Sequence, residues 1–267
     1  MANGIYVASS GAKARLEQLE TVSHNLANLM TAGFKRQEAV YREVHNEVHQ
    51  HMGSPDQAQG VRLPNRVLPE DRINTQIDDR YTYWSQGNLD ETGNVLDVAI
   101  EGQGFFKVRD SEGNEFLTRH GRFQLDDQGF VTNQSGLRLL DIGGRDLRVP
   151  MGEGSLSISY DGRVAMGEVQ LGQIDMVDLE DGSNAVYNRA LSHVGESLFR
   201  VDDPNVVQKK ATGILRQGYM EGSNVNAVTE MMSLLSASRL FEFNQQAIKG
   251  MGEMDQQAAR DVSRIQG

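Results

Sequence analysis

The sequence contains no cysteine, only five prolines and a single tryptophan among its 267 residues. The missing cysteines exclude disulfides, thiolate metal ligands and cysteine nucleophiles. No apolar run approaches the roughly 20 residues that a helix needs to cross a bilayer. The mean hydropathy of -0.49 is typical of a water-soluble chain. Because the first residues show no basic stretch followed by an apolar core, we expect no secretory signal peptide.

Positive charge is also scarce. The chain has 26 Lys and Arg against 37 Asp and Glu, which gives a formal net charge of -11. Nucleic-acid binding needs clustered Lys and Arg, so we expect no nucleic-acid partner, and the lack of long apolar runs predicts no membrane insertion. The 38% of hydrophobic residues suffices for a core, and the length allows one large domain or two modest ones.

The two ends of the chain share one pattern. Residues 5–30 and 224–265 contain no proline, and each carries apolar residues seven apart, which predicts a long heptad-like helix. We expect Gly33 to end the first helix in a left-handed conformation, and Ser223 or Asn224 to cap the second. These stripes predict an assembly interface made of Ile5, Ala12, Leu19, Val22, Leu26, Leu29, Leu234, Phe241, Ile248 and Val262.

Between the ends the pattern changes to short apolar runs separated by turn signals. Seventeen of the 28 glycines lie between Gly87 and Gly195. "LDDQGF" and "SYDGRV" are hairpin-turn candidates, so this region predicts a small all-β domain. The fold class expected is α+β, with long N- and C-terminal helices flanking an inserted, hairpin-rich all-β domain. The expected parts are residues 1–36 (helix), 37–80 (linker or extension), 81–217 (all-β outer domain) and 218–267 (helix).

A candidate metal site lies in "HNEVHQH", where His45, Glu47, His49 and His51 crowd together. A helix would bring His45 and His49 together, but zinc proteases use H-E-x-x-H and a further ligand, whereas Glu47 stands one position too late. "GQGFFK" and "GGRDLR" lack the spacing of phosphate-binding loops. We assign no catalytic, cofactor-binding or metal-ligating residue and expect a protein that is not an enzyme.

Four stretches resemble the signatures of one family. They are "SHNLANLMTAGFKRQ" at 23–37, "SQGNLDETGNVLDVAIEGQGFFKV" at 85–108, "LTRHGRFQLDDQGFVTNQSGLRLL" at 117–140 and "GYMEGSNVNAVTEMMSLLSASRLFEFNQQAIKGM" at 218–251. In kind and in order they are similar to the signatures of bacterial flagellar rod and hook proteins. The residues taken as family signature are Asn25, Asn28, Gly33, Phe34, Asp97, Gly102, Phe105, Phe106, Ser223, Asn224 and Asn226.

The resemblance implies a structural subunit of the flagellar basal-body rod. Such subunits pass through the flagellar type III export apparatus without a cleaved signal peptide. They assemble in the periplasmic space, as homo-oligomers or helical polymers with other rod subunits, through their terminal helices. The opening "GIYVASSGA" and the absence of a proline-rich stretch in 141–200 favour the proximal-rod type over the distal-rod type. A ligand-binding β domain with helical dimerisation arms is the alternative, and both terminal segments are expected to be poorly ordered before assembly.

If the stripes are buried on assembly, Leu26→Asp or Leu234→Asp will place a charge inside an apolar contact, where it is costly. We expect each variant to block rod assembly and abolish motility while the β domain keeps its circular dichroism spectrum. Normal swimming with either variant would count against the predicted interface.

Overall fold

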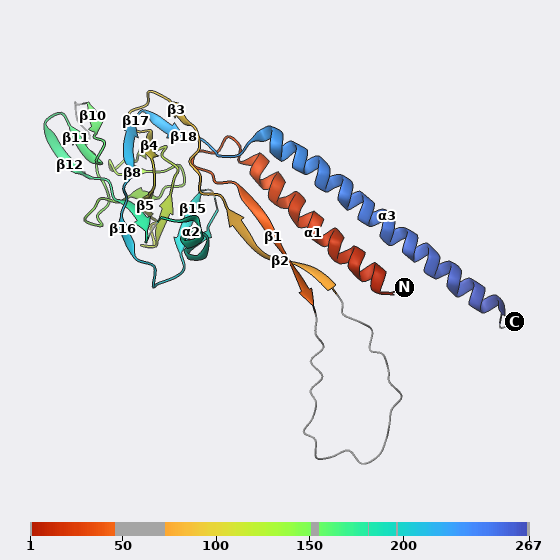
Figure 1. Ribbon diagram of the computed structural model, residues 1–267. Helices are drawn as coiled ribbons and strands as arrows, with labels where there is room; N and C mark the ends of the chain where they lie inside the picture. Colours follow the sequence, from red (N-terminus) through yellow and green to blue (C-terminus); the bar gives the residue numbers. More distant parts are fainter. Residues whose placement is uncertain (1, 46–72, 151–154, 181, 196, 266–267) are drawn as a thin grey trace, which may run out of the picture. The chain divides into compact units, whose positions relative to one another are not determined.

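The structure is a computed structural model that describes residues 2–45, 73–150, 155–180, 182–195 and 197–265 (Figure 1). The chain forms two compact units, each built from segments far apart in sequence. Unit one comprises residues 1–22, 39–80 and 231–267, and unit two comprises residues 23–38 and 81–230. Among the described residues, no helix combines the length and apolar character needed to span a membrane.

Unit one contains most of two long helices, α1 (Ala2–Ala27) and α3 (Ala227–Ile265), which run side by side in Figure 1. Gly11 of α1 lies against Asn244 of α3, because a Cβ added to Gly11 would stand 3.6 Å from the Asn244 amide nitrogen. Ala14 and Ala237 are the deeply buried small residues of the two helices. The α+β class with helices at both ends is thereby confirmed, whereas heptad packing between the helices stays a prediction.

Two predicted helix ends need correction. The side-chain oxygen of Asn226 accepts hydrogen bonds from the backbone N–H groups of Val228 and Thr229, at 3.0 and 3.2 Å. Asn226 therefore caps α3, in place of the predicted Ser223 or Asn224, because only an acceptor directly before the first turn reaches its free N–H groups. Gly33 has the expected positive φ of 65°, but α1 already ends at Ala27, so Gly33 is not the capping residue.

Two strands complete unit one. β1 (Gln37–His45) pairs with β2 (Ile73–Thr82), and the Tyr41 hydroxyl donates to the Ala14 carbonyl of α1 at 3.1 Å. Because His45 ends a strand, the helix that would have placed it beside His49 does not form there. Glu47, His49 and His51 lie outside the described residues.

Unit two contains the hairpin-rich β region that the glycine pattern predicted. Its largest sheet has nine strands, with the order β14-β15-β6-β5-β9-β8-β7 and with β13 joining β5 to β16. The strands are β5 (Phe105–Arg109), β6 (Glu115–Thr118), β7 (Gln124–Leu125), β8 (Val131–Thr132), β9 (Arg138–Leu139), β13 (Met176–Leu179), β14 (Leu191–His193), β15 (Leu198–Val201) and β16 (Gln208–Lys210).

Smaller sheets flank the large one. β17 (Ile214–Gln217) pairs with β4 (Val98–Glu101), and β18 (Tyr219–Glu221) pairs with β3 (Leu89–Glu91), both antiparallel. A three-stranded sheet contains β10 (Leu156–Ile158), β11 (Arg163–Met166) and β12 (Val169–Gln173). The short helix α2 (Asn184–Ala190), capped by Ser183, has no counterpart in the sequence prediction.

Unit two has two apolar cores, and β5 supplies both. Successive side chains of a strand point to opposite faces, so Phe106 joins one core with Val108 and Leu139, while Phe105 joins the other. In the second core Trp84 meets Phe105 and Phe199 edge-on at 5.6 and 4.7 Å between ring centroids. The adjacent phenylalanines of "GQGFFK" thus tie two cores to one strand.

The two predicted hairpin turns are present in unit two. Gly129 and Gly162, in "LDDQGF" and "SYDGRV", adopt positive φ values of 81° and 91° between paired strands, as expected.

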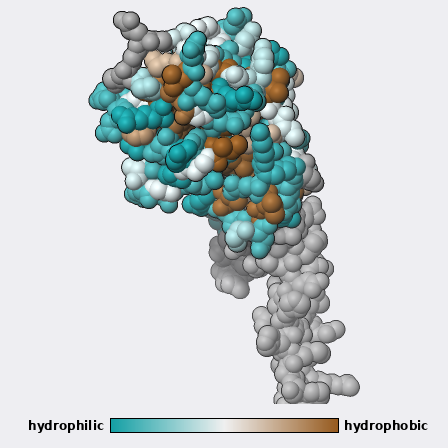
Figure 2. Space-filling view, turned by 90° about the vertical axis from the view of Figure 1, so that its left-hand side faces the viewer, coloured by the Kyte–Doolittle hydropathy of each residue, from teal (hydrophilic) through white to brown (hydrophobic). Residues whose placement is uncertain are grey.

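Figure 2 shows that one face of the molecule is mainly hydrophilic, with separate brown areas among teal residues. Single exposed apolar residues of this kind are normal on protein surfaces.

Gly121 provides a direct test of the packing in unit two. A Cβ at Gly121 would stand 1.8 Å from the Val98 carbonyl oxygen, so Gly121→Ala should lower the melting temperature of the chain by several degrees or prevent folding. Gly252→Ala in α3 is the matched control: its Cβ meets nothing within 4 Å, and alanine favours a helix over glycine by about 1 kcal/mol. Equal melting temperatures for both variants would contradict this packing.

Candidate functional site: the junction of the terminal segments

The segment that follows α1 and the segment that precedes α3 meet inside unit two. The backbone N–H of Gly33 donates to the carbonyl of Glu221 at 2.8 Å, and the backbone N–H of Arg36 donates to the side-chain oxygen of Asn224 at 2.7 Å. We call the residues that connect these segments the junction: Asn25, Gly33, Lys35, Arg36, Gln37, Arg119, Glu221, Asn224 and Glu230.

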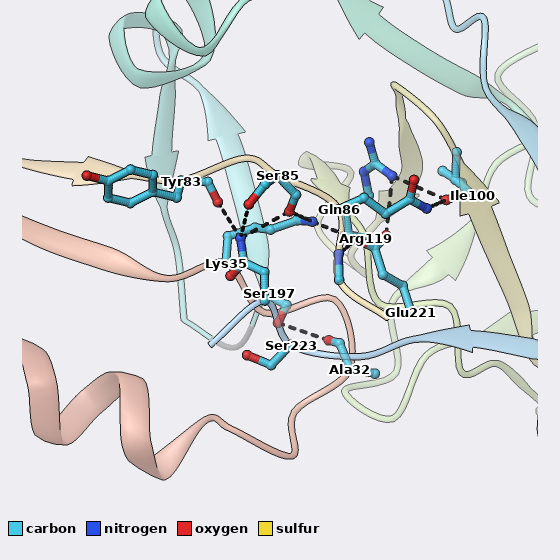
Figure 3. Close-up of polar contacts among 12 residues, drawn as sticks. Ala32, Lys35, Tyr83, Ser85, Gln86, Ile100, Arg119, Ser197, Glu221 and Ser223 are labelled. Atoms are coloured by element: carbon cyan, nitrogen blue, oxygen red, sulfur yellow. Dashed lines mark hydrogen bonds and ion pairs between the residues drawn. The ribbon is translucent and has the colours of Figure 1, made fainter. Parts of the chain in front are cut away.

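The centre of the junction is a buried ionic cluster, drawn in Figure 3. Nζ of Lys35 lies 2.6 Å from Oε1 of Glu221, and Nη1 of Arg119 lies 3.2 Å from Oε2 of the same carboxylate. Lys35 is 1% exposed, Glu221 0% and Arg119 6%. The carboxylate also accepts the backbone N–H of Gly87 at 3.0 Å. One carboxylate therefore joins elements from four regions of the chain.

Backbone carbonyls accept further hydrogen bonds from the two cations. Lys35 donates to the Ser85 carbonyl at 2.9 Å, and Nη2 of Arg119 donates to the Gly102 carbonyl at 2.8 Å. The guanidinium also lies 5.2 Å from the centroid of the Phe105 ring. Burial lowers the pKa of the Lys35 ammonium below its ordinary value, while the charge of Glu221 opposes this effect. Removal of Glu221 would leave two buried cations without their counter-charge.

A second network links the end of α1 to the first turn of α3. Asn25 exchanges two hydrogen bonds with the backbone of Gln37, at 2.8 and 2.9 Å, and donates to Glu230 at 3.3 Å. Glu230 also accepts from Nε of Arg36 at 2.6 Å and is 1% exposed. For Arg36, burial acts to lower the pKa, but the hydrogen bond and charge of Glu230 raise it above its ordinary value.

Asn224 connects the junction to the strand region. Its side-chain nitrogen donates to the carbonyls of Tyr83 and Ser85, at 2.8 and 3.0 Å, while its oxygen accepts the N–H of Arg36. An amide group supplies both donors and an acceptor, so this one side chain holds three backbone segments together.

Gly33 is required by a close approach of two backbones. Its φ is 65°, and a Cβ there would stand 2.4 Å from the carbonyl carbon of Arg119. Phe34, directly after it, is 1% exposed and meets the His24 ring edge-on at 5.4 Å. The turn thus lays Phe34 and Lys35 into unit two.

The other signature residues lie at or near the same place. Gly102 has a φ of 101°, and its carbonyl accepts a hydrogen bond from Arg119. The Asp97 carbonyl accepts a hydrogen bond from the N–H of Gly218 at 2.8 Å. Asn28 donates to the His24 carbonyl at 2.9 Å after the end of α1, and Ser223 accepts the N–H of Val225 at 3.3 Å. Apart from Phe105 and Phe106, which belong to the two apolar cores, the signature residues lie at turns, at helix ends or in the junction.

The predicted assembly residues are placed differently. Those with described side chains are half-buried, except for Val22, which is buried; they are Ala12, Leu19, Leu26, Leu29, Leu234, Phe241 and Ile248. The side chains of Ile5 and Val262 lie outside the described residues. The most exposed large apolar residues of α3 lie apart from the predicted stripe, with Met232 (67%) and Phe243 (66%) among them.

The predicted signature set lacks six members of the junction. They stand inside the quoted family stretches but carried no separate signal, because nothing in a linear pattern shows which charge is buried; they are Lys35, Arg36, Gln37, Arg119, Glu221 and Glu230. Asn25, Lys35 and Arg36 are fixed to the segment before α3, whereas the poor order of the terminal segments before assembly stays a prediction.

The described part of unit two also contains an open hollow of about 290 Å³, bordered by Met30, His120, Arg122, Asn133 and Met220. Its polar groups are mostly uncharged. The described residues contain no group of three or more His, Asp or Glu side chains able to hold a metal ion. The hollow thus offers a small polar surface and no recognisable pair of acid and base.

Glu221→Ala tests the junction. Breaking a buried ion pair by removal of one partner typically costs about 3–5 kcal/mol, so we expect a comparable loss in the free energy of unfolding by urea. Glu112→Ala, at an exposed glutamate in the turn between β5 and β6, is the control and should change it by less than about 0.5 kcal/mol. Similar stability for both variants would show that the buried cluster contributes nothing to the fold.

Three family models match the chain. The one described as "Flagella basal body rod protein" covers residues 5–35, the "Flagellar hook protein FlgE/F/G D1 domain" covers 99–166, and the "Flagellar basal body rod FlgEFG protein C-terminal" covers 216–261. Lys35, Arg119 and Glu221 fall one in each match, so the buried cluster joins the three matched parts.

Full-length relatives agree with these matches. The chain is 30% identical to the flagellar basal-body rod protein FlgG of Buchnera aphidicola subsp. Acyrthosiphon pisum, over 97% of this chain and 100% of the relative. It is 28% identical to the flagellar basal-body rod protein FlgF of Caulobacter vibrioides, over 99% and 100%. It is 29% identical to FlgF of Rhizobium meliloti, over 91% and 90%. The chain belongs to the family of flagellar basal-body rod proteins.

Proposed function

We propose that this chain is a structural subunit of the bacterial flagellar basal-body rod, and that it polymerises through its terminal helices into the shaft that transmits torque. The junction is the observation that carries the proposal. It fixes the end of α1 and the start of α3 to one another through buried charges. Because the end of α1 and the start of α3 are held together there, these two helix ends and the β region form one body, unit two.

Stiffness is the property that such a shaft needs. Helices packed at the density of a protein interior resist sliding, because displacement breaks many side-chain contacts at once. At the junction the same resistance is electrostatic, since moving Lys35 or Arg119 away from Glu221 would strand a charge in an apolar interior. The junction thus resists separation of the two terminal segments from the β region within unit two.

The proposal includes the route and the partners. The subunit is exported by the flagellar type III apparatus, assembles in the periplasmic space with other rod subunits, and has no catalytic activity. Its contacts with neighbours are heterologous, and heterologous contacts that do not close generate filaments. The hollow beside Met30 could serve a ligand-binding module, but its few charged groups give that alternative no specific support.

The position along the rod is a finer part of the proposal. Relatives named FlgF and FlgG have nearly equal identities of 28% and 30%. We retain the proximal-rod (FlgF) type, which the opening "GIYVASSGA" and the composition of residues 141–200 favour.

Deletion of the coding sequence in the bacterium that makes the protein should abolish swimming, and the wild-type chain supplied in trans should restore it. Gold-labelled antibody against the chain should then mark the rod in isolated basal bodies, at its proximal end. Basal bodies from the deletion strain are the control for the label. A label on the distal rod would refute the proximal assignment, and a motile deletion strain would refute a role as a rod subunit.

A further inference from the structure

The outer faces of α1 and α3 have complementary shapes and charges. On α3, Met232, Leu235, Phe243 and Met254 are exposed and, with Gly250, recur at intervals of three, four, seven or eight residues, so they form one stripe. This stripe faces away from Ala237 and Asn244, which lie on the buried side of α3. The stripe is unpartnered within the described residues.

Among the described residues, no contact requires a glycine at position 250. A Cβ there would meet nothing within 4 Å, and Gly250 is absent from the positive-φ positions of the described backbone. Glycine weakens a helix interior relative to alanine. A glycine on an exposed helix face makes room for a side chain that approaches from outside.

The outer face of α1 carries a matching row of exposed residues. Ser9, Lys13, Leu16, Glu20 and Ser23 recur at three- and four-residue intervals, on the face opposite Gly11 and Ala14. Leu16 is 45% exposed, although it is a large apolar residue. The row thus has one apolar knob, flanked by a positive and a negative charge and bounded by serines.

We propose that the outer face of α1 in one copy of the chain packs antiparallel on the outer face of α3 in the next copy, with Leu16 seated over Gly250. This inference rests on the proposed function, because it names the contact through which the subunit polymerises. Within one chain α1 and α3 are antiparallel, since Gly11 lies by Asn244 and Asn25 by Glu230. If successive copies are stacked in the same direction, α1 of one copy is also antiparallel to α3 of the next copy.

The register follows from the seating of Leu16. In an antiparallel pair, each step forward on α1 is a step back on α3, so Leu16 over Gly250 places Lys13 at Glu253 and Ser23 at Phe243. Glu20 then lies within one turn of Lys249. Opposite charges therefore meet on both sides of Leu16, and Phe243 meets a small residue, Ser23; Leu235 and Met232 would lie beyond the end of α1. Phe243 is 66% exposed in the single chain and would be covered.

Disulfide trapping tests this contact, since the chain has no cysteine and each introduced thiol is unique. The double variant Leu16→Cys with Gly250→Cys, expressed in place of the wild-type chain, should give a ladder of joined copies in oxidised basal bodies. The control Leu16→Cys with Arg239→Cys uses the same face of α3, about 16 Å further along the helix. It should stay monomeric, because a disulfide needs Cα atoms within about 7 Å.

A charge exchange provides the second measurement. Lys13→Glu or Glu253→Lys alone should reduce swimming at least several-fold, and the two together should restore most of it. Incorporation of the double cysteine variant into rods without a ladder would overturn the contact and leave the proposed function intact. An equal loss of swimming in the single and the double charge variants would also overturn the contact and leave the proposed function intact. Absence of the wild-type chain from rods would overturn both the function and the contact.

Discussion

The fold of unit two depends on one buried carboxylate. Glu221 is fully enclosed, and its two oxygens hold Lys35 from the N-terminal side, Arg119 from the strand region and the backbone of Gly87. A charge in such a place is tolerated only with all its partners in position. The buried charges therefore have all their partners only when three parts of the chain are folded together: the segment after α1, the β region and the segment before α3.

This dependence connects the fold to the role of the protein. α1 ends and α3 begins at a joint held by Asn25, Arg36 and Glu230, whose hydrogen bonds fix the two helix ends to each other within unit two. Beyond the joint, α1 and α3 meet at Gly11 and Asn244 and keep outer faces with exposed apolar residues. Inner contacts hold the two helices of the single chain together, and the outer faces are the ones that we propose meet its neighbours.

Much of this architecture could be read from the sequence. Proline-free apolar stripes predicted α1 and α3, and the glycine-rich turns predicted the hairpins around Gly129 and Gly162. The helix α2 was missed because a seven-residue helix gives too short a period, although Ser183 is a normal cap. The partners of Glu221 could not be predicted, since which charges are buried depends on contacts between positions 35, 119 and 221.

Native-state hydrogen exchange on the full chain tests the central claim most directly, which is that the joined segments and the β region form one cooperative body. The account predicts that the amides of Gly33, Arg36 and Gln37, each hydrogen-bonded in the junction, are protected as strongly as those of β5. Exchange of the junction amides that is faster by several orders of magnitude than exchange of the Phe106 and Val108 amides would contradict it. In that case the buried charges would not hold the terminal segments to the β region.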